Sequence, residues 1–503
     1  MKPSSILQAT LATLVAGVIF ATVAQGQTAP DQGRRPQQQQ TAGKGLLRLL
    51  PPDSTTEHTI DTADGRLAYT ATAGTLPFYD QSGEQSAAVF YTAYVAKNGD
   101  SNRPVTFAFN GGPGAASAFL HLGLVGPRIL DLGPDARDTA QMQLRDNPDT
   151  WLAFTDLVLI DPIGTGWSRT VKADDNKHFW GVQSDAEAMA KAIALYVARN
   201  NRAAAPKYLL GESYGGFRAA KTARALQREQ GISVAGIVML SPLIEGWLTF
   251  GDDQSALRAA LELPSLAAAE LERKKTFNPQ TLAAAEKFAM TDYLTTLAGP
   301  VPQGDRAKAF FGRVAEISGL PEDTVKRERG FITGAYVKSL REGKIVSHYD
   351  ATFAVDDPFP EQRAARGPDP ILDGVARSYG GAFANYARNE LGFKTEMTYA
   401  LLANDVTGHW NWGKGGRIAA GAESDLRVLL AFNRTFRLLI AHGVSDMVTP
   451  YATTRYVLDH MPPTDPPGRA RLKLYRGGHM FYLDPQSRKA FSADAAAFYR
   501  TAE

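Results

Sequence analysis

The pattern of hydrophobic and polar positions divides the chain into three kinds of sequence. In residues 59–97, apolar and polar positions alternate in short runs, which predicts antiparallel strands at the edge of a sheet. Largely apolar runs that are typical of buried strands follow at 107–109, 156–160, 208–210, 435–440 and 471–475. Residues 248–428 are instead rich in Ala, Leu, Glu and Lys at helical spacing, clearest in 265–275 and 281–297.

This order predicts an α/β protein with a central, mostly parallel sheet and an inserted helical cap. The strand-forming segments fall in two blocks, a first part of the core at 51–247 and a second part at 429–503, and the predicted cap at 248–428 separates them. The two blocks have to share one sheet if the candidate site residues named below are to meet. We find no internal repeat.

The N-terminus predicts export. Lys2 precedes an apolar stretch at 11–23 and the small-x-small sequence Ala24-Gln25-Gly26, so residues 1–26 are predicted to be a cleavable signal peptide. Residues 27–50 are rich in Gln, Pro and Gly, which predicts a flexible linker. The expected location is periplasmic or secreted, with no stable membrane anchor after cleavage; a retained N-terminal anchor is the alternative.

Composition removes several classes of function. The chain is 44% hydrophobic and 21% charged, and its formal net charge of +2 gives no electrostatic case for a nucleic-acid partner. It contains no cysteine, so thiol catalysis and cysteine-based zinc or iron–sulfur sites are excluded. We predict no metal and no organic cofactor.

A candidate nucleophile lies at Ser213. The sequence Gly211-Glu212-Ser213-Tyr214-Gly215 follows the apolar run 208–210 and precedes a helix-forming stretch. In a nucleophile elbow the serine occupies a strained strand-to-helix turn, and flanking glycines are needed because the turn leaves no room for a Cβ. This motif predicts the α/β-hydrolase fold, provided that an acid and a base follow in that order.

The candidate acid and base are Asp446 and His479. Asp446 follows the strand 435–440, and His479 follows the strand 471–475 and two glycines. Both are therefore predicted to lie on loops at the carboxyl ends of neighbouring strands, in the chain order Ser, Asp, His that this fold uses. Asp405 and Asp425 are alternative loop acids.

A glycine-rich loop supplies the fourth element of the candidate site. Residues 110–114, Asn-Gly-Gly-Pro-Gly, follow the strand 107–109. Hydrolases of this class take one oxyanion-hole N–H from such a loop and one from the residue after the nucleophile, which predicts Gly112 and Tyr214 as donors. A phosphate-binding loop is the competing interpretation, but no Lys follows these glycines.

The sequence allows two interpretations for each of two further segments. Residues 161–168, Asp-Pro-Ile-Gly-Thr-Gly-Trp-Ser, either shape a wall of the site or form a structural turn. Trp410 and Trp412 either line the substrate cleft from the cap side or pack against the core.

At these positions the chain resembles the serine carboxypeptidase family. Residues 110–114 match its N-G-G-P-G box, 211–216 match G-E-S-Y-A/G-G, and 161–168 match D-x-P-x-G-T-G-x-S in shortened form. Asp446 with Pro450, and Gly478-His479-Met480, match the two remaining boxes. The five motifs keep the family's order, and the absence of cysteine suggests a bacterial type of member.

The resemblance implies a site for the terminal carboxylate of a peptide. It assigns the hydrogen bonds to that carboxylate to Asn110 and Gly111, and it assigns to Glu212 a proton shared with the same assembly. The family's second glutamate corresponds to Leu124, so half of the expected clamp is missing. Arg128 either replaces it through an ionic contact or is an exposed structural residue.

Three hypotheses of different kinds follow. The first is a serine-type carboxypeptidase that releases C-terminal residues from peptides with a free C-terminus, through a Ser-Asp-His triad and an acyl-enzyme. The second, motivated by Leu124, is a serine esterase or acyltransferase on the same scaffold. The third is a catalytically silent binding protein. The sequence leaves side-chain specificity, pH optimum, physiological substrate and oligomeric state open.

Overall fold

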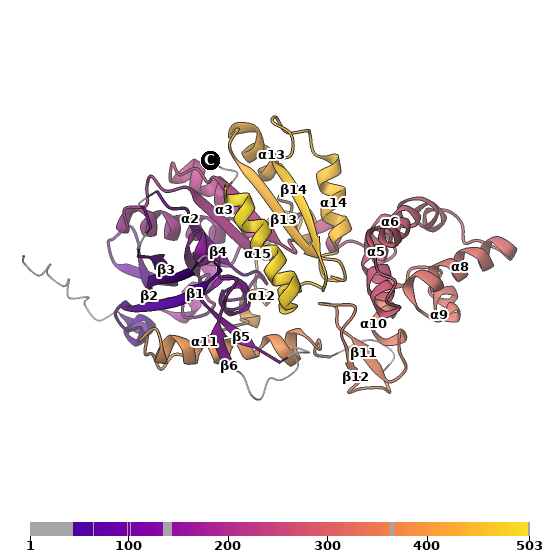
Figure 1. The fold of residues 1–503 in the computed structure, drawn as a ribbon, viewed down its shortest axis with the longest axis horizontal. Coiled ribbons are helices and arrows are strands. Elements are labelled where there is room, and N and C mark those ends of the chain that lie inside the picture. Colours follow the sequence, from indigo (N-terminus) through magenta and orange to yellow (C-terminus); the bar gives the residue numbers. More distant parts are fainter. Residues whose placement is uncertain are drawn as a thin grey trace, which may run out of the picture. The chain divides into compact units, whose positions relative to one another are not determined.

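The fold is described from a computed structural model (Figure 1). It describes residues 44–63, 65–97, 99–100, 102–133, 143–362 and 367–500. The predicted signal peptide and most of the predicted linker lie outside these residues. Within the described part, no helix has the length and apolar character needed to cross a membrane.

A single large sheet forms the centre of the fold, in the strand order β1-β2-β3-β7-β4-β9-β10-β13-β14, with β8 paired to β3. Its strands are β1 (Ser54–Thr62), β2 (Gly65–Tyr79), β3 (Gln85–Ala96), β4 (Val105–Phe109), β7 (Asp156–Ile160), β8 (Arg169–Thr170), β9 (Lys207–Glu212), β10 (Gly236–Leu240), β13 (Arg437–Gly443) and β14 (Ala470–Tyr475). Two small two-stranded sheets pair β5 (Arg128–Asp131) with β6 (Gln143–Asp146), and β11 (Lys344–Val346) with β12 (Ala354–Asp356).

The direction of the strands matches the two kinds of hydrophobic pattern. Strands β1, β2 and β3 pair antiparallel at one edge, as the alternating residues predict. From β7 through β14 all neighbours are parallel. The carboxyl ends of parallel strands share one edge of the sheet, so the residues that follow β4, β9, β13 and β14 are brought to the same side.

Helices cover both faces of the sheet (Figure 1). They are α1 (Ala118–Leu120), α2 (Val182–Arg199), α3 (Tyr214–Glu229), α4 (Gly246–Thr249), α11 (Ser378–Asn389), α12 (Asn404–Gly408), α13 (Glu423–Phe432), α14 (Tyr451–His460) and α15 (Pro485–Arg500). Because strand side chains alternate between faces, Leu209 of β9 packs in a cluster with α2 and α3, while Leu210 packs in a second cluster with α11 and α15. A mostly parallel sheet covered on both faces, with an elbow after β9, is the α/β-hydrolase fold that the sequence predicts.

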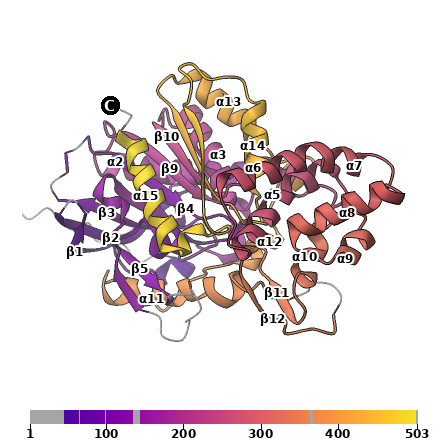
Figure 2. The same cartoon turned by 45° about the vertical axis from the view of Figure 1, so that its right-hand side comes forward.

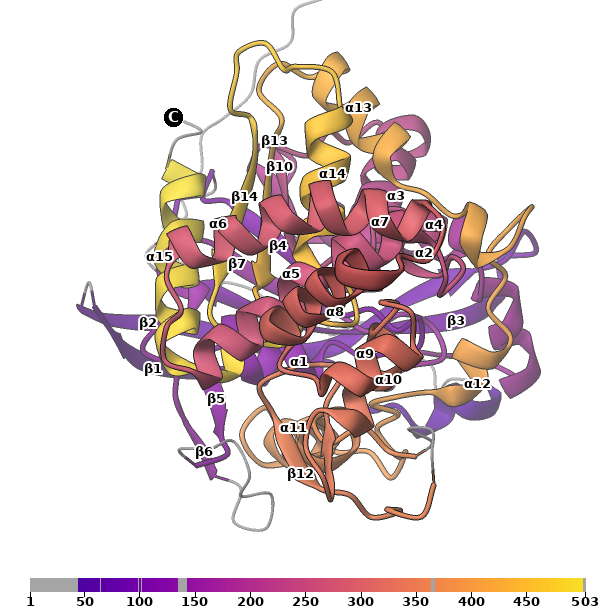
Figure 3. The same ribbon diagram turned by 90° about the vertical axis from the view of Figure 1, so that its right-hand side faces the viewer.

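A third hydrophobic cluster belongs to a group of helices outside this layered core (Figures 2 and 3). The elements are α5 (Ala256–Arg273), α6 (Pro279–Phe288), α7 (Leu294–Ala298), α8 (Gly304–Ser318), α9 (Glu322–Arg327), α10 (Thr333–Ser339), β11 and β12. Helix α5 packs against α14 of the core. Glu286 of α6 fixes this arrangement, since it accepts a hydrogen bond from Tyr451 at 2.6 Å and pairs with Arg455 at 2.7 Å.

Other residues of the predicted cap pack directly on the sheet. Tyr379, Phe383 and Tyr386 of α11 belong to the same cluster as strand residues such as Leu210. At the other end of the chain, the last residues of the predicted linker include a 3-10 helix, Gly45–Leu49, whose Leu47 is buried. The domain boundaries given above stay a prediction.

Candidate active site

Ser213 lies in the sharp turn between β9 and α3. Its backbone has φ 61° and ψ −125°, a conformation that non-glycine residues rarely adopt. A Cβ at Gly211 would lie 2.0 Å from the carbonyl oxygen of Gly215, and one at Gly215 would lie 2.6 Å from that of Phe109. The turn is therefore closed to larger residues at both glycines, and it presents Ser213 at the carboxyl edge of the sheet, directly before the N-terminus of a helix.

Asp446 and His479 meet at the ends of β13 and β14. The Nδ1 atom of His479 lies 2.9 Å from Oδ2 of Asp446, and both side chains are almost fully buried. Burial on its own lowers the pKa of His479, but the charge and hydrogen bond of Asp446 outweigh it, so that this pKa is raised above its ordinary value. A carboxylate that holds an imidazole in this way stabilises the imidazolium form.

Thr449, which the sequence analysis did not identify, contacts both Asp446 and His479. Its hydroxyl lies 2.9 Å from Oδ2 of Asp446 and 3.1 Å from Nδ1 of His479. The N–H groups of Val448 and Thr449 donate to the other oxygen of Asp446, at 2.7 and 3.0 Å. The tight turn after Asp446 therefore supplies the donors that hold a buried carboxylate.

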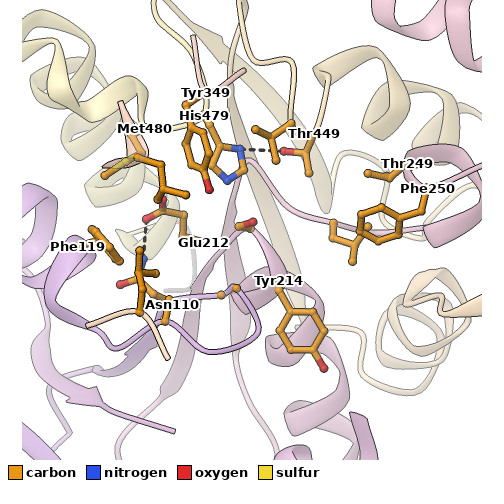
Figure 4. Close-up of a pocket in the computed structure, with 18 residues that line it drawn as sticks. Asn110, Phe119, Glu212, Tyr214, Thr249, Phe250, Tyr349, Thr449, His479 and Met480 are labelled. Atoms are coloured by element: carbon orange, nitrogen blue, oxygen red, sulfur yellow. Dashed lines mark hydrogen bonds between the residues drawn. The ribbon is translucent and has the colours of Figure 1, made fainter. Parts of the chain in front are cut away.

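A segment far away in the sequence holds the base loop in place (Figure 4). The N–H of His479 donates to the carbonyl of Tyr349 at 2.5 Å, and the two rings meet edge to face with centroids 5.1 Å apart. Beside it, the Ser445 hydroxyl donates to Asp350 at 2.8 Å, and the Met447 N–H donates to the carbonyl of His348. Residues 348–350 thus bind both the loop that contains Asp446 and the loop that contains His479.

Several of the residues described so far line one cavity of about 150 Å³, among them Ser213, Tyr349, Thr449 and His479. Ser213 and His479 both line it, although in the described part of the chain no hydrogen bond joins their side chains. Such bonds are often long before substrate binds. The wall is mostly apolar and comes from residues widely separated in the sequence, namely Ala115, Phe119, Leu243, Phe250, Tyr349, Leu372, Leu402, Val448 and Met480.

The predicted oxyanion-hole residues line the same cavity. Gly112 lies in the loop after β4, and Tyr214 is the first residue of α3. The ring of Tyr214 points away from His479 in Figure 4. It meets Trp410 and Trp412 edge to face, with centroids 5.3 and 5.4 Å apart. Neither tryptophan lines this cavity, so both pack behind the elbow.

A second buried carboxyl group, Glu212, lines the same cavity. Asn110 donates to Oε2 of Glu212 at 2.8 Å, and the Tyr482 hydroxyl donates to the same oxygen at 2.8 Å. Burial raises the pKa of Glu212 to about 7, against the lowering effects of His479 and of these two donors. Gly111 lies beside Asn110 in the cavity wall.

Two candidates from the sequence lie elsewhere. Arg128 pairs with Asp146 at 2.5 Å and with Glu390 at 3.3 Å and does not line the cavity, in line with the structural interpretation. Leu124 is fully buried in the apolar cluster that contains α11.

The segment 161–168 and the alternative loop acids also lie outside this cavity. One oxygen of Asp161 accepts hydrogen bonds from the backbone and hydroxyl of Ser117. The segment is therefore a structural turn that supports the start of α1. The alternative acid Asp425 pairs with Lys221 of α3 at 2.6 Å, and Asp405 lies in α12; neither contributes to the cavity wall.

The described residues hold no group of three or more His, Cys, Asp or Glu side chains arranged to bind a metal ion. The polar side chains that line the cavity include the hydroxyl of Ser213, the imidazole of His479 and the carboxyl group of Glu212.

Comparison with known proteins agrees with the three motifs that lie at 110–114, 161–168 and 211–216. Residues 68–247 match the family model of the serine carboxypeptidases, which confirms the predicted resemblance to that family. Among curated proteins of Arabidopsis thaliana, serine carboxypeptidase-like 44 is 29% identical over 130 residues and serine carboxypeptidase-like 34 is 26% identical over 148. These stretches cover 25% and 29% of this chain and 26% and 28% of the relatives, so the chain matches about a quarter of their length.

Solved structures are similar to this chain at lower sequence identity. A proline iminopeptidase from Mycobacterium smegmatis is 17% identical, with a TM-score of 0.39, and the match covers 86% of this chain and 98% of that one. An esterase from Thermogutta terrifontis is 12% identical, with a TM-score of 0.35, and the match covers 89% and 99%. The fold assignment rests on the sheet order and the elbow described above.

Proposed function

We propose that this protein is a serine-type carboxypeptidase that releases C-terminal residues from peptides. The observation that carries the proposal is the content of one cavity. Ser213, in a strained turn, and His479, bound to Asp446, line this cavity together with Asn110 and Glu212, which form a hydrogen-bonded pair. The first set suits attack on a carbonyl, and the second suits binding of a free carboxylate.

The reaction follows from these positions. His479 takes the proton of the Ser213 hydroxyl as the serine oxygen attacks the carbonyl carbon of the last peptide bond. The N–H groups of Gly112 and Tyr214 stabilise the oxyanion, and the N-terminus of α3 favours the same negative charge. His479 then protonates the leaving amine, and water, activated by the same imidazole, hydrolyses the acyl-enzyme. Asp446 stabilises the imidazolium in both halves of the reaction.

The substrate's terminal carboxylate would lie against Asn110, Gly111 and Glu212. At acidic pH a neutral Glu212 donates a hydrogen bond to that carboxylate, whereas an ionised Glu212 repels it. The partners are therefore peptides with a free C-terminus. The predicted signal peptide supports a periplasmic or secreted location.

An esterase or acyltransferase is the second candidate. The specific observation in its favour is the buried, apolar Leu124 at the position of the family's second glutamate. With only one acidic group facing the carboxylate, the requirement for a free C-terminus is expected to be weaker.

Three forms of one N-blocked peptide separate these functions: the free acid, the C-terminal amide and the methyl ester. At pH 5 a carboxypeptidase releases the last residue from the free acid in preference to the amide. Turnover of the ester with the acid untouched would assign an esterase or acyltransferase instead. Ser213→Ala is the control, with an expected loss of about 10⁶ in kcat, and a fluorophosphonate that fails to label the native protein would reject serine catalysis altogether.

A further inference from the structure

The hydrogen bonds around Glu212 are distributed unequally between its two oxygens. Oε2 receives both Asn110 Nδ2 and the Tyr482 hydroxyl, each at 2.8 Å. The orientation of the Asn110 amide is fixed independently, because its Oδ1 accepts the backbone N–H of Leu120 at 3.1 Å. The group that faces Glu212 is therefore a donor, and Oε2 accepts two hydrogen bonds.

Tyr482, which donates to this carboxyl group, also packs against the backbone at Gly123, the residue before Leu124. It belongs to the short 3-10 helix Phe481–Leu483 that follows the base loop, and its side chain is fully buried. A Cβ at Gly123 would lie 2.7 Å from Cε2 of Tyr482, so the ring packs tightly against the backbone beside Leu124. Tyr482 and Leu124 belong to the same apolar cluster, and only Tyr482 brings a polar atom to Glu212.

Two donors on one oxygen decide where the carboxyl proton lies. An oxygen that accepts from an amide and a phenol is a poor site for a proton of its own. The proton of a neutral Glu212 is therefore held on Oε1, the oxygen left for the cavity that Glu212 lines. Burial, which raises the pKa of Glu212 to about 7, keeps this proton in place at acidic pH.

We propose that Tyr482 is a positioning residue that, together with Asn110, directs the proton of Glu212 toward the cavity, so that one carboxyl group binds the C-terminal carboxylate of a peptide. The proton is shared between Glu212 Oε1 and one carboxylate oxygen of the substrate, and no covalent bond changes. The inference rests on the proposed carboxypeptidase function and adds a residue that the sequence motifs do not contain.

The experiment measures kcat/KM for an N-blocked peptide acid, divided by kcat/KM for its methyl ester, from pH 5 to 9. The rate with the ester measures the activity of Ser213, His479 and Asp446 in each variant, because the ester has no free carboxylate. The ratio of the two values therefore measures the contribution of carboxylate binding. In the native protein the ratio falls as pH rises through about 7, as Glu212 ionises. In Tyr482→Phe the ratio at pH 5 falls by roughly two- to tenfold, the effect of one lost hydrogen bond.

The pH dependence separates positioning from a general structural effect. The Tyr482 hydroxyl favours the ionised form of Glu212, so its removal moves the midpoint of the fall upward, by about one pH unit. Tyr475→Phe is the matched control, because it deletes a phenol that donates to a carboxylate, Asp494, at 2.7 Å outside the cavity. This control is expected to retain the native ratio and midpoint.

The outcomes are distinguishable. A native protein that turns over only the ester rejects the carboxypeptidase function and this inference with it. A native protein that cleaves the acid, with the same ratio and midpoint in Tyr482→Phe, rejects the inference alone. If Tyr482→Phe does not fold, Glu212→Gln replaces it as the test, because the glutamine amide can direct its oxygen to the two donors and its NH₂ group to the cavity. We expect that the acid-to-ester ratio of this variant no longer depends on pH around 7. An unchanged pH dependence would overturn the proposal.

Discussion

The candidate site has two buried carboxyl groups in opposite environments: Glu212 lines the cavity, and Asp446 lies behind His479. Asp446 accepts four hydrogen bonds spread over both of its oxygens, from two backbone N–H groups, the Thr449 hydroxyl and His479. Within the described part of the chain, Glu212 accepts two hydrogen bonds, both on Oε2. The donors around Asp446 suit a carboxylate, and the apolar surroundings of Glu212 suit a neutral acid.

In the proposed reaction the two carboxyl groups have two different tasks. Asp446 stabilises a positive charge on His479, and Glu212 offers a proton to the carboxylate of the substrate. Environments that separate the protonation states of neighbouring acids allow acid and base roles to coexist at one pH. The predictions below test each side of the comparison.

Among variants that keep the Ser213 hydroxyl, the largest effect is expected from Asp446→Asn. The amide keeps the size of the side chain but favours the wrong tautomer of His479, so kcat should fall by about 10⁴. The loss should be similar for acid and ester substrates, as measured by steady-state kinetics, because Asp446 acts on the reacting centre and not on the carboxylate. A loss confined to acid substrates would contradict the role given to Asp446.

Tyr349→Ala tests the packing of the base. Loss of the ring that meets His479 edge to face frees the imidazole to move, and a displaced base is expected to lower kcat by on the order of 10 to 100. Tyr349→Phe keeps the ring and serves as the control. Equal kinetics for Tyr349→Ala and the native protein with both substrates would show that the backbone bond alone holds His479.

Glu212→Gln should change the pH dependence of stability. Glu212 has a folded-state pKa of about 7, above the ordinary 4.5, so its contribution is fully present below 4.5 and is lost as pH rises through 7. Between pH 4 and pH 9 the native protein should therefore lose on the order of 3 kcal/mol that the glutamine variant does not lose.

Urea unfolding of both proteins at the two pH values measures this difference. A difference that is the same at pH 4 and pH 9 would show that folding does not raise the pKa of Glu212. In that case the claim that Glu212 is a neutral acid below pH 7 would be wrong.

The smallest effect is expected from Arg128→Gln. Its partners Asp146 and Glu390 are partly exposed, and such ion pairs contribute about 0 to 1 kcal/mol. KM for a peptide acid should change less than twofold. A tenfold increase in that KM, with the ester unaffected, would bring Arg128 into the carboxylate site.

The sequence predicts the fold and the motif residues because their requirements are local. Gly211 and Gly215 are needed by a turn only five residues long, and Asp446 and His479 each follow a strand that is apolar enough to identify. The mostly parallel sheet follows from the same runs.

The remaining contacts depend on tertiary packing. Tyr349 lies 130 residues before His479, and nothing in its neighbourhood marks it as a partner of the base. Tyr482 is only three residues after His479, but its bond to Glu212 depends on the space left at Gly123. The sequence shows that Leu124 replaces the expected acid, whereas the contact between Tyr482 and Glu212 is visible only in the structure.

The most direct measurement is the pH dependence of selectivity in the native protein: kcat/KM for an N-blocked peptide acid relative to its methyl ester, at pH 5 and at pH 8. If a neutral Glu212 binds the terminal carboxylate, the acid is hydrolysed at pH 5 and the ratio falls at least tenfold by pH 8. A ratio that stays constant, or an acid that is not hydrolysed at either pH, would contradict this account.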